Sequence, residues 1–276
     1  MPINSLMSIQ SNNYSGVVIP PLPYALCWYD MNDSTNLFDI SGHNISALGV
    51  KVKTVNNKAV QSPNVNNLVA CDVSVNYTTY TLTNVNGVGI NGISNASNTK
   101  TGFKTDGFTD ISGGFAVMMI LTPQGANCPY WCKFTTVPYP FSFQTFSRSI
   151  SNGTSTTTLT SSFSTFTAFT NPILFYNDFN ATTMKYNEYV DSSGTLINGT
   201  SLYYADISSN PLFIGTKNAV GWGAYKFYEM LVFPSPLSTT ERQIVEGWLA
   251  TKYNLLGNLP AAHPYKGGYF GTNPLH

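Results

Sequence analysis

Ionisable side chains that could do chemistry are scarce in this sequence. It contains four glutamates, nine aspartates and three histidines, namely His43, His263 and His276. No pair of these histidines has the spacing of metal ligands, and the H-E-x-x-H and C-x-x-C motifs are missing as well. The sequence therefore predicts no catalytic residue, no metal site and no cofactor.

One glycine pattern could in principle hold a dinucleotide. Gly87-Val-Gly89-Ile-Asn-Gly92 matches G-x-G-x-x-G and follows an expected strand. The turn-forming stretch 93–99 stands where a helix should begin, so the free N–H groups and the helix dipole that hold a pyrophosphate are not expected. We interpret the pattern as a Gly/Asn hairpin loop.

Aromatic side chains are the abundant functional resource. They make up 14% of the chain, with four Trp, 17 Tyr and 17 Phe. Sugars stack on exposed rings, and Tyr130, Trp131 and Trp222 lie in loop-like sequence contexts, so these three are the candidate carbohydrate-binding residues. The alternative is that the same rings fill the core or a subunit contact, because aromatic residues dominate both.

Charged residues are few and balanced. They make up 9% of the chain, against roughly 25% in an average soluble domain, and 13 basic residues match 13 acidic ones. A chain without net charge has no long-range field that gathers phosphates, so nucleic acid is not an expected partner. Near-zero net charge favours association instead, which predicts copies of the chain or other structural proteins as partners.

Neither a membrane span nor an export signal is expected. The longest apolar run, Phe115 to Leu121, is far below the roughly 20 residues that cross a bilayer. No Lys or Arg precedes Lys51, so the basic region that begins a secretory signal is missing. We therefore expect no insertion into a membrane.

The elements that must position these residues are mainly strands. From Tyr24 onward, short runs of β-branched and aromatic residues are each closed by Gly, Asn or Pro, which is typical of an all-β domain. Tyr225–Phe233 is apolar at both alternate sets of positions and predicts a strand buried on both faces. We also expect one long strand at Leu68–Thr83 and a hairpin at Asp191-Ser-Ser-Gly194, with the glycine supplying the positive φ.

One helix is expected near the end of the chain. Ser238-Thr239-Thr240-Glu241 forms a capping box, and Gly257 and Pro260 mark the stop. These signals predict an amphipathic helix over about 239–255. Its apolar face consists of Ile244, Val245, Trp248, Leu249 and Tyr253.

Two ends of the chain resemble a known family. The segment from Tyr225 to Leu255, with its E-R-Q-x-V-E-G-W-L-A helix, and Leu259-Pro-Ala-Ala-His-Pro-Tyr265 resemble the end of concanavalin A-like, laminin G-like jelly-roll domains. Leu26-Cys-Trp-Tyr-Asp-Met-Asn-Asp and the stretch 45–59 resemble the opening strand of these domains and the turn after it. In that family a core strand with an acidic residue, here Glu229, leads into a short amphipathic helix.

The resemblance implies an all-β fold, a concanavalin A-like jelly-roll sandwich of two antiparallel sheets with one short C-terminal amphipathic helix. It covers roughly residues 24–265. The first 23 residues are Ser/Asn-rich and then Pro-rich, which predicts an extended arm that could reach a neighbouring subunit. Residues 266–276 form a tail.

The same fold hosts glucanases that carry an E-x-D-x-x-E strand. That spacing does not occur in this sequence, and Glu229 has Leu231 and Phe233 at the positions where a second carboxylate would stand. A retaining glycosidase needs two carboxyl groups about 5 Å apart. The sequence therefore predicts a protein that is not an enzyme.

The family recurs in structural proteins of large DNA viruses and in bacterial surface proteins. The resemblance therefore implies a non-enzymatic structural or interaction protein, a capsid-associated or surface component of a virion that docks through apolar and aromatic faces. Its expected location is a virion or an extracellular surface. The alternative is a lectin-like carbohydrate-binding module that attaches to a glycan surface.

Overall fold

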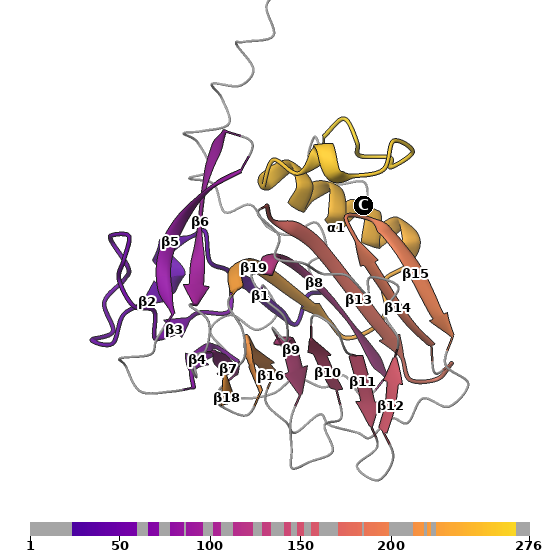
Figure 1. Cartoon of the computed structure of the whole chain (residues 1–276), viewed down its shortest axis with the longest axis horizontal. Helices are drawn as coiled ribbons and strands as arrows, with labels where there is room; N and C mark the ends of the chain where they lie inside the picture. Colours follow the sequence, from indigo (N-terminus) through magenta and orange to yellow (C-terminus); the bar gives the residue numbers. More distant parts are fainter. Residues whose placement is uncertain are drawn as a thin grey trace, which may run out of the picture.

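The computed structural model describes residues 24–59, 66–71, 78–85, 87–95, 102–105, 113–123, 129–133, 141–144, 148–151, 156–159, 171–183, 185–198, 212–217, 220–221 and 225–268. In these residues the chain forms two antiparallel sheets packed face to face, with one α-helix on the outside (Figure 1). The prediction of an all-β sandwich with one C-terminal helix is confirmed. The expected arm at 1–23 lies outside the described residues, as does the end of the expected tail.

The sheet beneath the helix, called here the helix-side sheet, contains the longest strands. Its order is β15 (Ser193–Asn198), β14 (Lys185–Val190), β13 (Ile173–Asn180), β8 (Gly114–Pro123), β19 (Tyr225–Phe233), β6 (Val88–Asn95) and β5 (Thr79–Val85). The opening strand β1 (Cys27–Asp30) pairs with the second half of β19. The first and the last strand therefore pair in the middle of this sheet.

The second sheet, called here the opposite sheet, is built from shorter strands. Its order is β12 (Thr156–Leu159), β11 (Arg148–Ser151), β10 (Phe141–Gln144), β9 (Pro129–Lys133), β16 (Leu212–Ile214), β7 (Phe103–Thr105), β4 (Leu68–Ala70), β3 (Thr54–Val55) and β2 (Leu37–Phe38). A separate two-stranded ladder joins β17 (Thr216–Lys217) to β18 (Val220–Gly221). Short 3-10 turns lie at Ser34–Asn36 and Leu256–Asn258.

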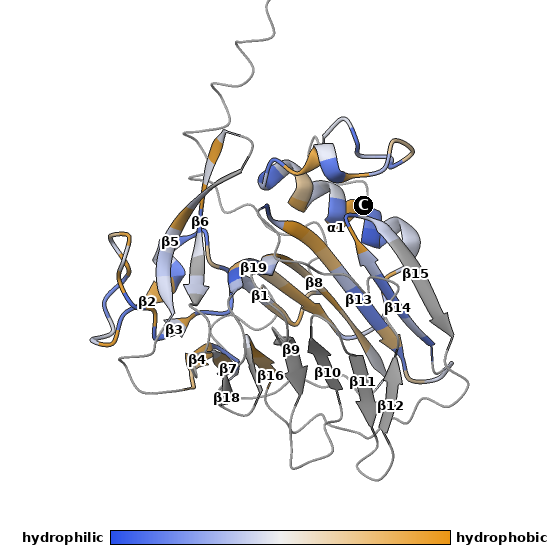
Figure 2. Ribbon diagram, viewed as in Figure 1, coloured by the Kyte–Doolittle hydropathy of each residue, from blue (hydrophilic) through white to orange (hydrophobic). Residues whose placement is uncertain are grey.

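Apolar residues fill both faces of the helix-side sheet. Between the sheets, Val117, Met119 and Phe175 pack against Phe103 and Ile214 of the opposite sheet. On the outer face, a second cluster packs against the helix; it includes Met118, Ile120, Leu231, Trp248 and Leu249. Because both faces are covered, β8 is apolar from Phe115 to Leu121 and β19 from Met230 to Phe233, as the hydropathy colouring in Figure 2 shows. The prediction of a doubly buried strand at Tyr225–Phe233 is confirmed.

The helix α1 (Thr239–Lys252) begins where its capping box predicts. The Ser238 side chain accepts a hydrogen bond from the N–H of Glu241, and the Glu241 carboxylate accepts one from the N–H of Ser238. The helix ends three residues earlier than expected, because Asn254 adopts a left-handed φ of 55° and a 3-10 turn follows. Lys252 in the last turn is favourably placed against the helix dipole.

Two hairpin turns test the sequence interpretation. The glycine pattern 87–92 forms the β5–β6 hairpin, with Val85 paired to Val88 and Gly87 at a φ of 84°, so the hairpin interpretation is confirmed. The β14–β15 hairpin also forms, but its left-handed residues are Asp191 and Ser192 and not the glycine. A short polar side chain can adopt this conformation when local hydrogen bonds compensate for its strain. Here the Asp191 carboxylate accepts a hydrogen bond from the N–H of Leu174.

The expected long strand at Leu68–Thr83 is wrong. The structure separates it into β4 in the opposite sheet and β5 in the helix-side sheet. An apolar period of two fits either sheet, because the pattern carries no information about where the chain crosses from one layer to the other.

Candidate functional site

Two carboxylates meet beneath the C-terminal end of the helix. Asp30 ends β1, and the register of β1 on β19 places it directly opposite Glu229. The pairing of β19 with β8 shifts between Phe227 and Glu229, which leaves Tyr228 as an extra residue. As a result Tyr228 packs in the cluster under the helix, and Glu229 also reaches the helix side.

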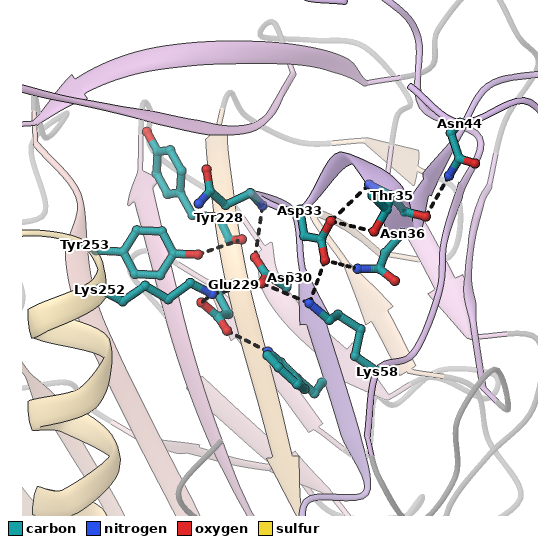
Figure 3. A network of polar contacts seen from close by, with 12 residues as sticks. Asp30, Asp33, Thr35, Asn36, Asn44, Lys58, Tyr228, Glu229, Lys252 and Tyr253 are labelled. Atoms are coloured by element: carbon teal, nitrogen blue, oxygen red, sulfur yellow. Dashed lines mark hydrogen bonds and ion pairs between the residues drawn. The ribbon is translucent and has the colours of Figure 1, made fainter. Parts of the chain in front are cut away.

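A lysine from the helix lies between these carboxylates (Figure 3). Lys252 Nζ is 2.9 Å from Asp30 Oδ2 and 2.7 Å from Glu229 Oε2. The second Glu229 oxygen accepts a hydrogen bond from Trp28 Nε1 at 2.6 Å. Like charges directly opposite on neighbouring strands are destabilising, so the ammonium group is what allows this pair to form.

A second lysine extends the network towards the surface. Lys58 Nζ lies 2.8 Å from Asp33 Oδ2 and 3.4 Å from Asp30 Oδ2. It also lies 4.4 Å from the centre of the Trp28 ring, a cation–π contact. The Asn57 side chain positions this segment, accepting the N–H groups of Trp28 and Ala59 at 2.8 and 3.0 Å. We call Trp28, Asp30, Asp33, Lys58, Glu229 and Lys252 the lysine cluster.

Lys252 is stabilised in its charged form, whereas burial raises the pKa of Glu229 above its ordinary value although the charge of Lys252 lowers it. Burial alone would lower the pKa of Lys252, but the charges of Asp30 and Glu229 raise it above its ordinary value, so this side chain stays protonated. Burial tends to raise the pKa of Asp33, but hydrogen bonds from Lys58 and Thr35 lower it overall. Glu229 is fully buried and Asp30 nearly so. A carboxylate held in this way is not placed to exchange protons with a substrate.

A second ionic cluster lies nearer the N-terminal end of the helix. Arg242 bonds to one oxygen of Glu246, and the other oxygen contacts Ser192 Oγ at 2.8 Å and His263 Nε2 at 3.1 Å. The Arg242 guanidinium also lies 3.9 Å from the centre of the Tyr189 ring. We call Ser192, Arg242, Glu246 and His263 the arginine cluster.

The arginine cluster contains a serine, a histidine and an acid, but not in a nucleophilic order. The N–H of Tyr265 donates to His263 Nδ1 at 3.2 Å, so Nε2 carries the proton and donates it to Glu246. The carboxylate thus lies between the serine and the histidine, and among the described residues no contact joins Ser192 to His263. A base that accepts the serine proton is what nucleophilic catalysis requires. The arrangement instead holds the C-terminal segment against the helix.

The three candidate carbohydrate residues are only partly placed. Trp131 in β9 pairs with Ile214 of β16, and Ile214 lies in the core between the sheets. Tyr130 is the extra residue where the pairing of β9 with β10 shifts, from Phe143 opposite Trp131 to Gln144 opposite Pro129. Trp222 lies outside the described residues. Trp131 therefore lies opposite a residue of β10, whereas Tyr130 has no residue opposite it in that strand.

Sequence reasoning singled out Glu229 but missed Asp30, Lys58 and Lys252. A signal for two of them was present. Asp30 is the acid of the opening strand, and Lys252 lies in the last turn of the helix that follows β19. Lys58 carried no such signal, because only the fold brings its loop beside β1. Within the described residues, no three His, Cys, Asp or Glu side chains converge on a point that could hold a metal ion.

No protein-family model and no curated protein sequence matches this chain. Among solved structures, the chain is similar to an arabinofuranosidase complexed with arabinofuranosyl-α-1,2-xylobiose, with 10% identity and a TM-score of 0.53. It is also similar to a mutant α-L-arabinofuranosidase soaked with 4-nitrophenyl α-L-arabinofuranoside, with 11% identity and a TM-score of 0.52. Each match covers 80% of this chain and 61% of the other, so the chain spans about three fifths of the length of these enzymes.

These similarities establish the fold, an antiparallel β-sandwich, and they correct one prediction. The sequence predicted a protein that is not an enzyme, but the solved structures with this fold include glycoside hydrolases. The missing E-x-D-x-x-E spacing excludes only carboxyl groups carried by one strand. Two carboxyl groups can also come from different strands, although the pair that meets across β1 and β19, Asp30 and Glu229, is buried and bonded to Lys252.

Proposed function

We propose that this chain recognises neutral glycans. The observation that carries the proposal is the sandwich it shares with arabinofuranosidases, one of which is seen with an arabinofuranosyl-xylobiose. The absence of net charge supports a neutral ligand over an acidic one, because no long-range field would gather anions. In the described residues, the lysine and arginine clusters are committed to holding the helix, so the proposed site lies elsewhere.

The proposed site is the outer face of the opposite sheet. The outer face of the helix-side sheet is covered by α1, and its inner face packs in the core. In β7, Phe103 and Thr105 are buried whereas Lys104 is exposed, so Lys104 faces outward. The sheet register aligns Lys104 with Val69 and Phe213, and Phe213 with Cys132 in β9. Solvent therefore reaches this face at Lys104, whereas Phe213, beside the strand that carries Tyr130, is buried.

Membership of the laminin G-like family is part of the same proposal. The segments that carry the resemblance, β1 and the β19–α1 unit, are the ones that the lysine cluster joins. An opening strand tied to the closing strand and helix would explain why both ends of the chain share the family pattern. Lectin-like relatives of this kind would bind sugars on a sheet or at loops beside it.

The test is a binding measurement combined with an assay of hydrolysis. The full chain is titrated with neutral oligosaccharides, including arabinofuranosyl-substituted xylo-oligosaccharides, by calorimetry, and released sugar is measured in the same samples. Saturable binding that Tyr130→Ala and Lys104→Glu weaken, and that Ile40→Ala leaves unchanged, would support the proposal. Released sugar would add an activity to the binding. No binding to any neutral glycan would overturn the proposal.

A structural component of a virion or surface layer is the second candidate. Exposed large apolar side chains favour it, namely Ile40, Leu48, Leu82 and Val88. A chain without net charge has little to keep its copies apart. Fractionation of the source material, followed by detection of the chain with an antibody, tests this candidate. Recovery in particles or on the outer surface would support it, and recovery only as a free protein would contradict it.

A further inference from the structure

We propose that two copies of this chain pair through the free edge of β5, in a continuous sheet with a two-fold axis at Thr83. The proposal does not depend on glycan recognition. β5 is the last strand of the helix-side sheet, and β6 pairs with one of its sides only. On the other side, segment 49–52 covers the beginning of β5, and further along no described residue bonds to it.

The beginning of this edge is covered by the chain's own segment 49–52. Val52 N–H donates to Thr78, Tyr80 N–H donates to Val50, and Gly49 N–H donates to Tyr80, all at 2.8 to 2.9 Å. The peptide groups of Tyr80 therefore point away from β6. Gly49 then adopts a φ of 84°, and the chain turns off the edge before it reaches Leu82.

The open part of the edge is a template for another strand. The β5–β6 register is regular, so the peptide groups of Leu82 and Asn84 point outward like those of Tyr80. Among the described residues, none bonds to Leu82 on this side. The Leu82 side chain is 54% exposed, and Leu48 and Val88, at 53% and 39%, are exposed too. Unpaired edge groups beside apolar side chains favour strand addition.

The sequence of the edge favours a second copy as the occupant. Natural sheets protect free edges with Lys, Pro or inward charges, but no charged residue and no proline occurs from Val73 to Thr99. An uncharged strand meets its own copy without repulsion, and the zero net charge of the chain adds none. In an antiparallel pairing, Leu82 of each copy bonds to Asn84 of the other. This pairing satisfies the outward N–H and C=O groups of both residues in both copies.

The part of the edge that is already covered limits the length of the new ladder. With Thr83 opposite its own copy, the new pairing is confined to Leu82, Thr83 and Asn84, because Val50 and Gly49 already bond to the outward peptide groups of Tyr80. The new ladder therefore ends where segment 49–52 begins.

Sedimentation velocity of the full chain provides the first test. We expect a dimer whose population rises with concentration, and we expect Leu82→Lys to be monomeric at the same concentrations. Ile40→Lys is the matched control, because Ile40 is 53% exposed and lies in a turn without hydrogen bonds to β5. A monomeric wild-type chain would overturn the proposal, as would a dimer that Leu82→Lys leaves intact.

Cross-linking gives a second test that does not depend on the charge substitution. In the proposed register, residues 82 and 84 of different copies have Cα atoms about 5.5 Å apart, within the range of a disulfide. Residues 82 and 82 are about 9 Å apart, which is too far. A mixture of Leu82→Cys and Asn84→Cys should therefore give a disulfide-linked dimer, located by mass spectrometry, whereas Leu82→Cys alone should not. Equal cross-linking of Leu82→Cys with itself would contradict this register.

Discussion

The lysine cluster and the arginine cluster fix the same helix to the same sheet near its two ends, but they do so with different chemistry. In the lysine cluster, one ammonium group is shared by two carboxylates from neighbouring strands. In the arginine cluster, one carboxylate is shared by a guanidinium, a serine and a neutral histidine. Removing the cation therefore leaves two buried like charges in the first case and a carboxylate that keeps two hydrogen bonds in the second.

The largest effect is expected from Lys252→Met. The substitution keeps the apolar stem but leaves Asp30 and Glu229 opposite each other without a cation, and loss of one partner of a buried pair costs about 3–5 kcal/mol. Urea unfolding measures the change in free energy of unfolding. Lys104→Met, at an exposed position, is the control and should change it by less than about 0.5 kcal/mol. Equal effects of the two substitutions would show that the lysine cluster does not hold the helix.

A smaller loss is expected from Arg242→Met. Glu246 keeps its hydrogen bonds from Ser192 and His263, so its charge is still partly compensated, and we expect a loss of about 2 kcal/mol. The cation–π contact with Tyr189 is lost in the same variant. The measurement is again urea unfolding. A loss as large as that of Lys252→Met would remove the distinction between the two clusters.

The helix cap should contribute less than either cluster. Ser238→Ala removes the side-chain acceptor of the Glu241 N–H, which costs about 1 kcal/mol at a helix N-terminus. Ser238→Asn keeps an acceptor and is the matched control. Thermal unfolding followed by circular dichroism should rank wild type and Ser238→Asn together above Ser238→Ala. An alanine variant as stable as wild type would show that packing alone sets the start of the helix.

The smallest effects, below about 1 kcal/mol, are expected from acidification, with opposite signs beside the two clusters. The pKa of Asp33 is lower in the folded state than in the unfolded state. Its contribution to stability is therefore present above the ordinary carboxyl pKa, and it is lost as the pH falls from there through the pKa of the folded state. Burial raises the pKa of Asp191, next to Ser192, so the folded state takes up this proton first and gains stability as pH falls.

The check is the unfolding free energy of Asp33→Asn and Asp191→Asn against wild type, measured from neutral pH down to about pH 3, below the ordinary carboxyl pKa. Asparagine keeps the oxygen that accepts the Thr35 N–H in the first variant and tolerates the left-handed φ in the second. Asp33→Asn should lose less stability in acid than wild type, and Asp191→Asn should lose more. The same sign in both variants would show that the two carboxyl groups do not differ in this way.

Elements whose signals are local could be predicted from the sequence. The Ser238–Glu241 capping box determines where α1 begins, because its hydrogen bonds lie within four residues. The apolar run of Tyr225–Phe233 determines a strand buried on both faces, and Gly87 a hairpin. Each of these depends on neighbours along the chain and is confirmed.

Contacts between distant residues could not be predicted in this way, because they depend on how the strands and the helix pack. Asp30 and Glu229 are 199 positions apart, and their contact with Lys252 depends on β1 pairing with β19 and on the helix folding back over both. The crossing from β4 to β5 and the free edge at Leu82 are likewise decided by which strands become neighbours. An apolar period of two along a strand indicates which residues share a face. The partner strand is selected by the entropy of closing long loops and by the burial of each face.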